Sequence, residues 1–303
     1  MYEQFYGLRE APFSLTPDTE FFYNYRAHQE ALNVLLVALK SREGFIKVTG
    51  EVGTGKTLLC RKLLNTLDAR FVTAYIPNPW LDPDALRKAL ATELGLDVAV
   101  GEDAHDLNNR IYQRLIEFAR DNRQVVLCLD EAQALPDESL EAVRLFTNLE
   151  TEKTKLLQVV LFGQPELDER LAQPRFRQLR QRITFAYRLT PLDREGVGEY
   201  VRHRLLVAGH QGGGLFQTRA LGALYAASHG IPRLVNVLSH KALMAAFGQG
   251  ARQVGPEHVR LAAEDTEGAA RAPGFPLRRW GYALAATLVL AVGLWGVLAG
   301  VRA

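Results

Sequence analysis

A glycine-rich octapeptide, Gly50–Thr57, limits the possible folds of this chain most sharply. It reads GEVGTGKT and fits the pattern G-x-x-x-x-G-K-[ST]. An apolar, β-rich run at residues 45–49 precedes it, and a leucine-rich helical run at residues 57–67 follows. Glycines let such a loop wrap closely around an anion, and the N–H groups at the following helix N-terminus then point at that anion. The strand and helix on either side favour a phosphate-binding loop over its alternative, a glycine-rich turn without a ligand.

This loop also predicts which residues contact a nucleotide. Lys56 is expected to reach the β- and γ-phosphates, and the Thr57 hydroxyl is expected to bind Mg²⁺. The nucleotide-binding set predicted from the loop is Gly50, Val52, Gly53, Thr54, Gly55, Lys56 and Thr57.

Two adjacent acids, Asp130 and Glu131, follow the apolar run VVLCL, which is typical of a buried parallel strand. Ligands of open α/β sheets lie at the carboxyl ends of the strands. Asp130 is therefore predicted to complete the nucleotide and Mg²⁺ site, and Glu131 to orient and deprotonate a water molecule. The alternative, that the two acids only open a loop, becomes weak beside a phosphate-binding loop.

Helical and β-rich runs alternate through the first 190 or so residues, which predicts an α/β unit with a parallel sheet and helices on both faces. Helical periodicity then dominates in the runs 193–208, 218–229, 232–247 and 256–264. We expect an α/β domain at 1–190, a small all-helical domain at 191–266 and a linker at 267–279. With 303 residues, 48% of them hydrophobic, the chain is long enough for both cores.

A run without charged residues at 280–301 is long enough to cross a hydrocarbon core of about 30 Å as a helix. Arg278 and Arg279 precede it, so the positive-inside rule places the preceding domains in the cytoplasm. The expectation is a single-pass protein of the bacterial inner membrane. A buried C-terminal core helix is the alternative.

Three further polar residues are candidates for the site. Arg182, at the end of a helix before the last strand, could reach a neighbouring subunit's γ-phosphate, with Arg180 as the other choice; a solvated or acid-binding arginine face is the alternative. Gln164 follows a strand and could bond the γ-phosphate or the attacking water, or could be an ordinary loop amide. Arg233, which begins a helix after Gly230, could move onto the phosphates when two domains close, or could lie on the surface.

The strings FYGLREAPFSLTPDTEFFYNYRAHQEAL, GEVGTGKT, DEAQALP, FGQPELDERL, LRQRI and GIPRLVN together resemble the AAA+ ATPases of the general secretion pathway protein A group over residues 1–266. The resemblance implies a P-loop NTPase (AAA+) sheet with a helical lid, ATP hydrolysis and ring-like self-assembly. It implies Gln164 as sensor 1, Arg182 as arginine finger and Arg233 as sensor 2. Phe13 and Phe21 would lie near the adenine.

The leading hypothesis is therefore a membrane-anchored ATPase that uses ATP and Mg²⁺ to support a type IV pilus, of the mannose-sensitive haemagglutinin kind, or a type II secretion machine. Its partners would be other copies of itself and pilus or secretion assembly proteins of the inner membrane. An ATP-gated scaffold with incidental hydrolysis and a DNA-binding regulator stay open as alternatives. A formal charge of +2 gives no overall field for nucleic acid, so a nucleic acid partner is not expected. The scattered histidines do not support a zinc site.

Overall fold

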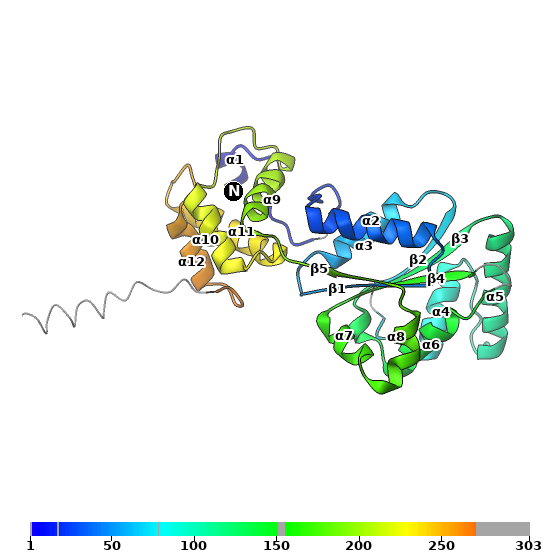
Figure 1. The fold of residues 1–303 in the computed structure, drawn as a ribbon. Helices are drawn as coiled ribbons and strands as arrows, with labels where there is room; N and C mark the ends of the chain where they lie inside the picture. The colour runs from blue at the N-terminus through cyan, green and yellow to red at the C-terminus, as the bar shows by residue number, and fades with distance from the viewer. Residues whose placement is uncertain (1, 17, 78, 151–154, 271–303) are drawn as a thin grey trace, which may run out of the picture.

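The structure is a computed structural model that describes residues 2–16, 18–77, 79–150 and 155–270. These residues form an α/β unit built around a sheet and a helical unit beside it (Figure 1). The chain passes from the N-terminal segment into the sheet and then, after the last strand, into the helical unit.

Within the described residues, the sheet has five strands in the order β2-β3-β4-β1-β5, and every neighbouring pair is parallel. The prediction of a parallel α/β sheet is confirmed. Because all the strands run the same way, their carboxyl ends lie along one edge, where the residues after β1, β3 and β4 meet. The strands are β1 (Phe45–Gly50), β2 (Phe71–Ile76), β3 (Gln124–Leu129), β4 (Leu157–Gly163) and β5 (Phe185–Leu189).

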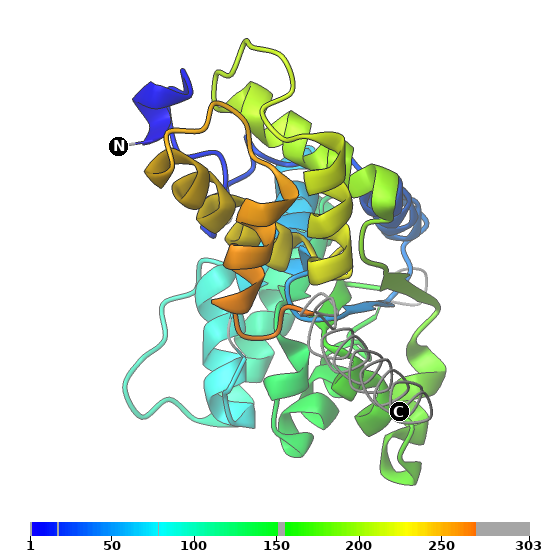
Figure 2. The ribbon, with the colours of Figure 1, turned by 90° about the vertical axis from the view of Figure 1, so that its left-hand side faces the viewer.

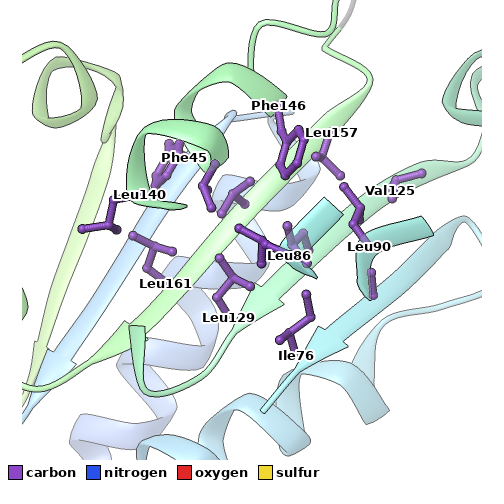
Figure 3. Close-up of a cluster of buried hydrophobic side chains, with 14 of the residues drawn as sticks. Phe45, Ile76, Leu86, Leu90, Val125, Leu129, Leu140, Phe146, Leu157 and Leu161 are labelled. Carbon is purple, nitrogen blue, oxygen red and sulfur yellow. The ribbon is translucent and has the colours of Figure 1, made fainter. Parts of the chain in front are cut away.

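Helices cover both faces of the sheet, and the alternation of side chains along each strand explains why. On β3, Val126 and Cys128 point into one apolar cluster, whereas Leu127 and Leu129 point into the other. Figure 3 shows part of the second cluster, with Leu129 and Leu161 beneath Leu86 and Leu140. The first cluster is covered by α2 (Arg26–Lys40) and α3 (Lys56–Thr66). The second is covered by α4 (Pro83–Glu93), α5 (Ala104–Arg120), α6 (Asp137–Phe146), α7 (Pro165–Leu171) and α8 (Arg177–Arg182), with short 3₁₀ turns η1 (Ala132–Ala134) and η2 (Pro174–Phe176).

Side-chain caps fix the start of several helices. Asp82 accepts a hydrogen bond of 2.7 Å from the N–H of Ala85, with Pro83 as the first helical residue of α4. Asp193 caps the first helix of the helical unit through a 2.7 Å bond from the N–H of Gly196. Such caps satisfy N–H groups that have no partner inside the helix.

The helical unit packs around its own apolar cluster, which also takes in the N-terminal segment. The segment begins with α1 (Tyr2–Phe5), which lies against this unit in both views (Figures 1 and 2). The Tyr2 hydroxyl lies 2.9 Å from Nδ1 of His240, and the Tyr6 hydroxyl donates to the carbonyl of Ala251 at 3.0 Å. The division into domains at residues 190, 266 and 279 stays a prediction. The unit contains α9 (Arg194–Val207), α10 (Thr218–Ser228), α11 (Pro232–Gly248) and α12 (Pro256–Glu264).

The structure corrects the predicted fold class and location in one respect. Among the described residues, no helix has both the length and the apolar character needed to cross a bilayer. The longest of these helices, α5 and α11, have 17 residues each. That is about 26 Å at 1.5 Å per residue, against a hydrocarbon core of about 30 Å. For the described residues, this finding overturns the prediction of a C-terminal transmembrane helix in a single-pass inner-membrane protein. The run at 280–301 on which it rested lies outside the described residues.

Candidate functional site

The glycine-rich octapeptide forms the turn between β1 and α3, as predicted. Gly53 and Gly55 have positive φ angles of 81° and 96°, a conformation that side chains other than glycine rarely adopt. Lys56, the first residue of α3, is only 4% exposed. Its Nζ donates to the carbonyl of Gly50 at 2.8 Å and to that of Glu51 at 3.0 Å. The lysine therefore lies across the loop and holds it closed.

Burial lowers the pKa of Lys56, and the nearby carboxylates of Glu131 and Asp130 act in the opposite direction. A buried cation with two carboxylates nearby is suited to a polyanion that carries a metal ion. The predicted phosphate-binding role of this loop thus has the electrostatics that it needs.

Asp130 follows β3 at the same edge of the sheet and is 2% exposed. Its carboxylate accepts hydrogen bonds from the Thr57 side chain and, at 3.0 Å, from the N–H of Glu131. Burial raises the pKa of Asp130, and these two hydrogen bonds lower it. The structure therefore brings the two predicted Mg²⁺ residues, Thr57 and Asp130, into contact. Hydroxyl and carboxylate oxygens are hard donors of the kind that Mg²⁺ binds, so the pair fits this ion.

Glu131 has a left-handed backbone conformation, with a φ of 53°. Its Oε2 accepts hydrogen bonds from the side-chain amides of Gln133 and Gln164, the latter at 3.0 Å. The N–H of Gln164 in turn donates to Oε1 of Gln133 at 3.0 Å. We call Gln133 and Gln164 the amide pair. Two predicted site residues, Glu131 and Gln164, are thus brought together by a third that the sequence analysis did not single out. The only signal for Gln133 was its place in the string DEAQALP.

Arg170 on α7 holds the backbone of Gln133 in place. Its guanidinium donates to the carbonyl of Gln133 at 2.7 Å and also pairs with Asp137 on α6. Arg175 pairs with the same carboxylate. Arg170 and Arg175 therefore share the carboxylate of Asp137.

Replacing Gln133 with alanine is expected to lower ATP turnover about tenfold, because Glu131 loses one hydrogen bond that orients its carboxylate. Nucleotide affinity should stay within about threefold of wild type, since Gln133 is outside the phosphate-binding loop. Steady-state phosphate release and a nucleotide titration measure the two effects. Gln113→Ala, at an exposed position on α5, is the matched control. Unchanged turnover in Gln133→Ala would show that the amide pair does not position Glu131.

The helical unit contacts the loop directly through the start of α11. The N–H of Arg233 donates to the carbonyl of Gly53 at 3.1 Å. A Cβ on Gly53 would lie 2.6 Å from the Cβ of Arg233, so the close approach requires glycine. Behind this contact, Gly230 has a φ of 74°, and a Cβ there would lie 1.8 Å from the carbonyl oxygen of Leu192. The turn before α11 is therefore built to bring Arg233 against the phosphate-binding loop.

A cavity of about 310 Å³ lies between the loop, the helical unit and the N-terminal segment. Its wall on the loop side includes the predicted residues Val52, Gly53, Gly55, Lys56, Thr57 and Glu131, and Arg233 closes it from the helical unit. The remaining lining residues are Ser14, Leu15, Thr16, Asp18, Leu58, Tyr200, Arg204, Pro232 and Asn236.

Arg204, which the sequence analysis missed, fixes one wall of this cavity. It is 5% exposed and donates to the carbonyls of Pro12 and Ser14 and to the Tyr200 hydroxyl. Its guanidinium lies 4.6 Å from the centroid of the Phe21 ring. Phe13 and Phe21 are thus buried among the side chains of the helical unit, whereas residues between them line the cavity. The cavity therefore runs from the loop, with Lys56 and Arg233, at one end to this wall at the other.

Arg182 does not reach the cavity of its own chain. It precedes β5 and donates to the Thr147 hydroxyl at 3.1 Å, beside Phe45 at the start of β1. The phosphate-binding loop follows the other end of β1, roughly 16 Å away for six residues of strand. Arg180 is exposed and contacts the carbonyl of Ala172 at 3.4 Å. A role for either arginine in catalysis therefore requires the site of another subunit.

The family model described as "AAA domain" matches residues 39–171, which contain the loop, Asp130, Glu131 and Gln164. General secretion pathway protein A of Aeromonas hydrophila is 43% identical over 296 residues. The match covers 98% of this chain and 54% of that protein, so the chain spans about half the length of its relative.

Solved structures with the same fold include Cdc6p of Pyrobaculum aerophilum, with a TM-score of 0.61 and 20% identity over 82% of this chain and 70% of that one. The ORC1 protein of Aeropyrum pernix in complex with DNA has a TM-score of 0.62 and 19% identity, covering 85% and 69% of the two chains. The RuvB Holliday junction branch migration motor of Thermotoga maritima has a TM-score of 0.52 and 17% identity, covering 84% and 72%. At these identities the likeness is one of fold alone. Because it is 43% identical to general secretion pathway protein A over 98% of its length and matches the AAA domain model, the chain belongs to the general secretion pathway protein A group of AAA+ proteins.

Proposed function

We propose that the protein binds ATP with Mg²⁺ in the cavity between the phosphate-binding loop and the helical unit, and that it hydrolyses ATP there. The contact between Thr57 and Asp130 beside the buried Lys56 carries this proposal, because two oxygen donors of the kind that Mg²⁺ prefers lie next to a buried cation suited to phosphate. Bound Mg²⁺ would neutralise charge on the phosphates. Glu131, oriented by the amide pair, would accept a proton from the attacking water, and Arg233 would contact the phosphates from the helical unit.

We infer that nucleotide binding and turnover support the assembly of a secretion machine or a related type IV pilus. The name of the relative, general secretion pathway protein A, supports this choice of process. The partners would be further copies of this chain, arranged in a ring-like oligomer, and assembly proteins of the pilus or the secretion machine.

A steady-state assay of the full chain tests the enzymatic part. Phosphate release from ATP should require Mg²⁺. Its rate should increase more than in proportion to the protein concentration, because an active site completed by Arg182 needs a second subunit. Absence of Mg²⁺-dependent phosphate release at every protein concentration would contradict the proposal.

Mixing two inactive variants tests whether Arg182 acts on a neighbour. Arg182→Ala should lower turnover about a thousandfold with little change in nucleotide affinity, because the arginine acts on charge that develops in the transition state. Arg182→Ala and Lys56→Ala mixed in equal amounts should recover part of the activity, since some interfaces then join an intact cavity to an intact Arg182. Arg180→Ala serves as control. Full activity in Arg182→Ala, or loss in Arg180→Ala instead, would reassign the arginine.

A further inference from the structure

A buried histidine contacts the phosphate-binding loop from outside the cavity. His28 lies in the first turn of α2 and is 6% exposed. Its Nε2 lies 2.9 Å from the carbonyl oxygen of Thr54, inside the loop. Residue 28 is remote in sequence from the loop and lies in the string RAHQEAL, for which the site described above has no role.

The chemistry of the contact fixes the state of the ring. A carbonyl oxygen only accepts hydrogen bonds, so Nε2 must carry the hydrogen and donate it. The other nitrogen, Nδ1, is buried and has no hydrogen-bond partner among the described residues. Burial lowers the pKa of His28, with the bond to Thr54 acting against this shift, and the ring is therefore neutral at pH 7. In this neutral form His28 has one ring N–H, and it donates that hydrogen to the carbonyl of Thr54.

The ring also packs against the loop. A Cβ built on Gly55 would lie 3.0 Å from Nε2 of His28, which is tighter than an ordinary contact. On another side, the Phe22 ring meets the imidazole edge-on, with centroids 5.9 Å apart. Leu35 and Leu39 anchor the rest of α2 in the apolar cluster under the sheet face. The histidine is thus held from behind by a rigid helix and touches the loop at Thr54 and Gly55.

His28 contacts the loop at a segment whose conformation phosphate binding requires. Gly53 and Gly55 have positive φ angles on either side of Thr54, so the peptide groups around it depend on outside contacts to hold their orientation. Internally, the Thr54 hydroxyl and N–H both bond to the carbonyl of Glu51, at 2.8 and 3.2 Å. The carbonyl of Thr54 points the other way and is held by His28.

We propose that His28 is a positioning residue that holds the Thr54–Gly55 peptide, and through it the inward N–H groups of the loop, in the conformation that binds phosphate. The effect on nucleotide affinity rests on the proposed function, whereas the effect on the loop does not. An imidazole is not needed for this role: any side chain that presents an N–H at the position of Nε2 suffices.

Hydrogen–deuterium exchange of the full chain without nucleotide measures the loop directly. In His28→Leu, amides of residues 53–58 should exchange about tenfold faster, the equivalent of one hydrogen bond of ordinary net strength. His28→Asn should behave like His28→Leu, because its shorter amide cannot reach the carbonyl of Thr54. His28→Gln presents an amide nitrogen near the position of Nε2 and should stay close to wild type. This rescue keeps the test informative even if His28→Leu does not fold.

Titration with ADP and Mg²⁺ should give the same order: wild type and His28→Gln within about threefold of each other, and His28→Asn and His28→Leu about tenfold weaker. His258→Gln is the matched control, since His258 is 3% exposed and hydrogen-bonded at both ring nitrogens but lies in α12. Loop exchange in His28→Asn equal to that of wild type would overturn the inference. Failure of wild type to bind ADP would overturn the proposed function instead, and the exchange result would still decide the role of His28.

Discussion

Lys56→Ala is expected to weaken ATP binding about a hundredfold, the equivalent of losing two charge-assisted hydrogen bonds to phosphate. The structure adds a second reason for a large effect. Lys56 holds the loop closed through the carbonyls of Gly50 and Glu51, and alanine removes these bonds as well. Isothermal titration of the full chain with ATP and Mg²⁺ measures the loss.

Lys40→Ala is the control for this substitution, because Lys40 is exposed at the end of α2 and contributes the same formal charge. It should bind ATP like wild type. Equal affinity in Lys56→Ala and Lys40→Ala would mean that the loop is a glycine-rich turn without a phosphate ligand.

Glu131→Gln is expected to lower ATP turnover by a factor of 10² to 10⁴ while leaving ATP affinity nearly unchanged, because the amide cannot accept the proton of the attacking water. The substitution keeps the shape of the side chain, and its carbonyl oxygen can still accept from the amide pair. A single preparation should therefore bind ATP and fail to release phosphate.

Glu51→Gln provides the comparison for Glu131→Gln. Glu51 also belongs to the loop region, but its side chain is 54% exposed and lies 3.9 Å from Arg188. Its replacement should leave turnover within about twofold of wild type. If Glu131→Gln hydrolyses ATP as fast as Glu51→Gln, Glu131 is not the general base. If it loses turnover but still supports assembly in cells, the protein acts as an ATP-gated scaffold.

The parts that the sequence predicted well are those with a fixed local geometry. The octapeptide Gly50–Thr57 specifies a strand, a turn and a helix within a few residues, and the structure has β1, the turn and α3 there. The meeting of Thr57, Asp130 and Gln164 at one edge follows from parallel strands, because the carboxyl ends of β1, β3 and β4 share that edge. The same rule predicts that Arg182 lies at the opposite edge of the sheet, because Arg182 precedes a strand instead of following one.

The contacts that the sequence did not predict depend on irregular backbone or on distant residues. Gln133 reaches Glu131 because Glu131 is left-handed and the next residues form a 3₁₀ turn, and no periodic pattern encodes that geometry. Arg204 lies about 190 positions from the N-terminal carbonyls that it binds. His28 is an ordinary helix residue in sequence, and only packing of α2 on the sheet brings it to the loop.

The apolar run at 280–301 illustrates a different limit. Its length and its lack of charged residues satisfy the criterion for a membrane span, which uses no information about the folded structure. None of the described helices meets that criterion, and the run itself lies outside the described residues.

Calorimetric titration of the correctly folded full chain with a slowly hydrolysed ATP analogue, with and without Mg²⁺, measures nucleotide binding in the proposed cavity. We expect saturable binding of one nucleotide per chain, tighter with Mg²⁺ because Thr57 and Asp130 then bind the metal, and about a hundredfold weaker in Lys56→Ala. No heat of binding from folded wild-type protein at millimolar nucleotide would contradict it.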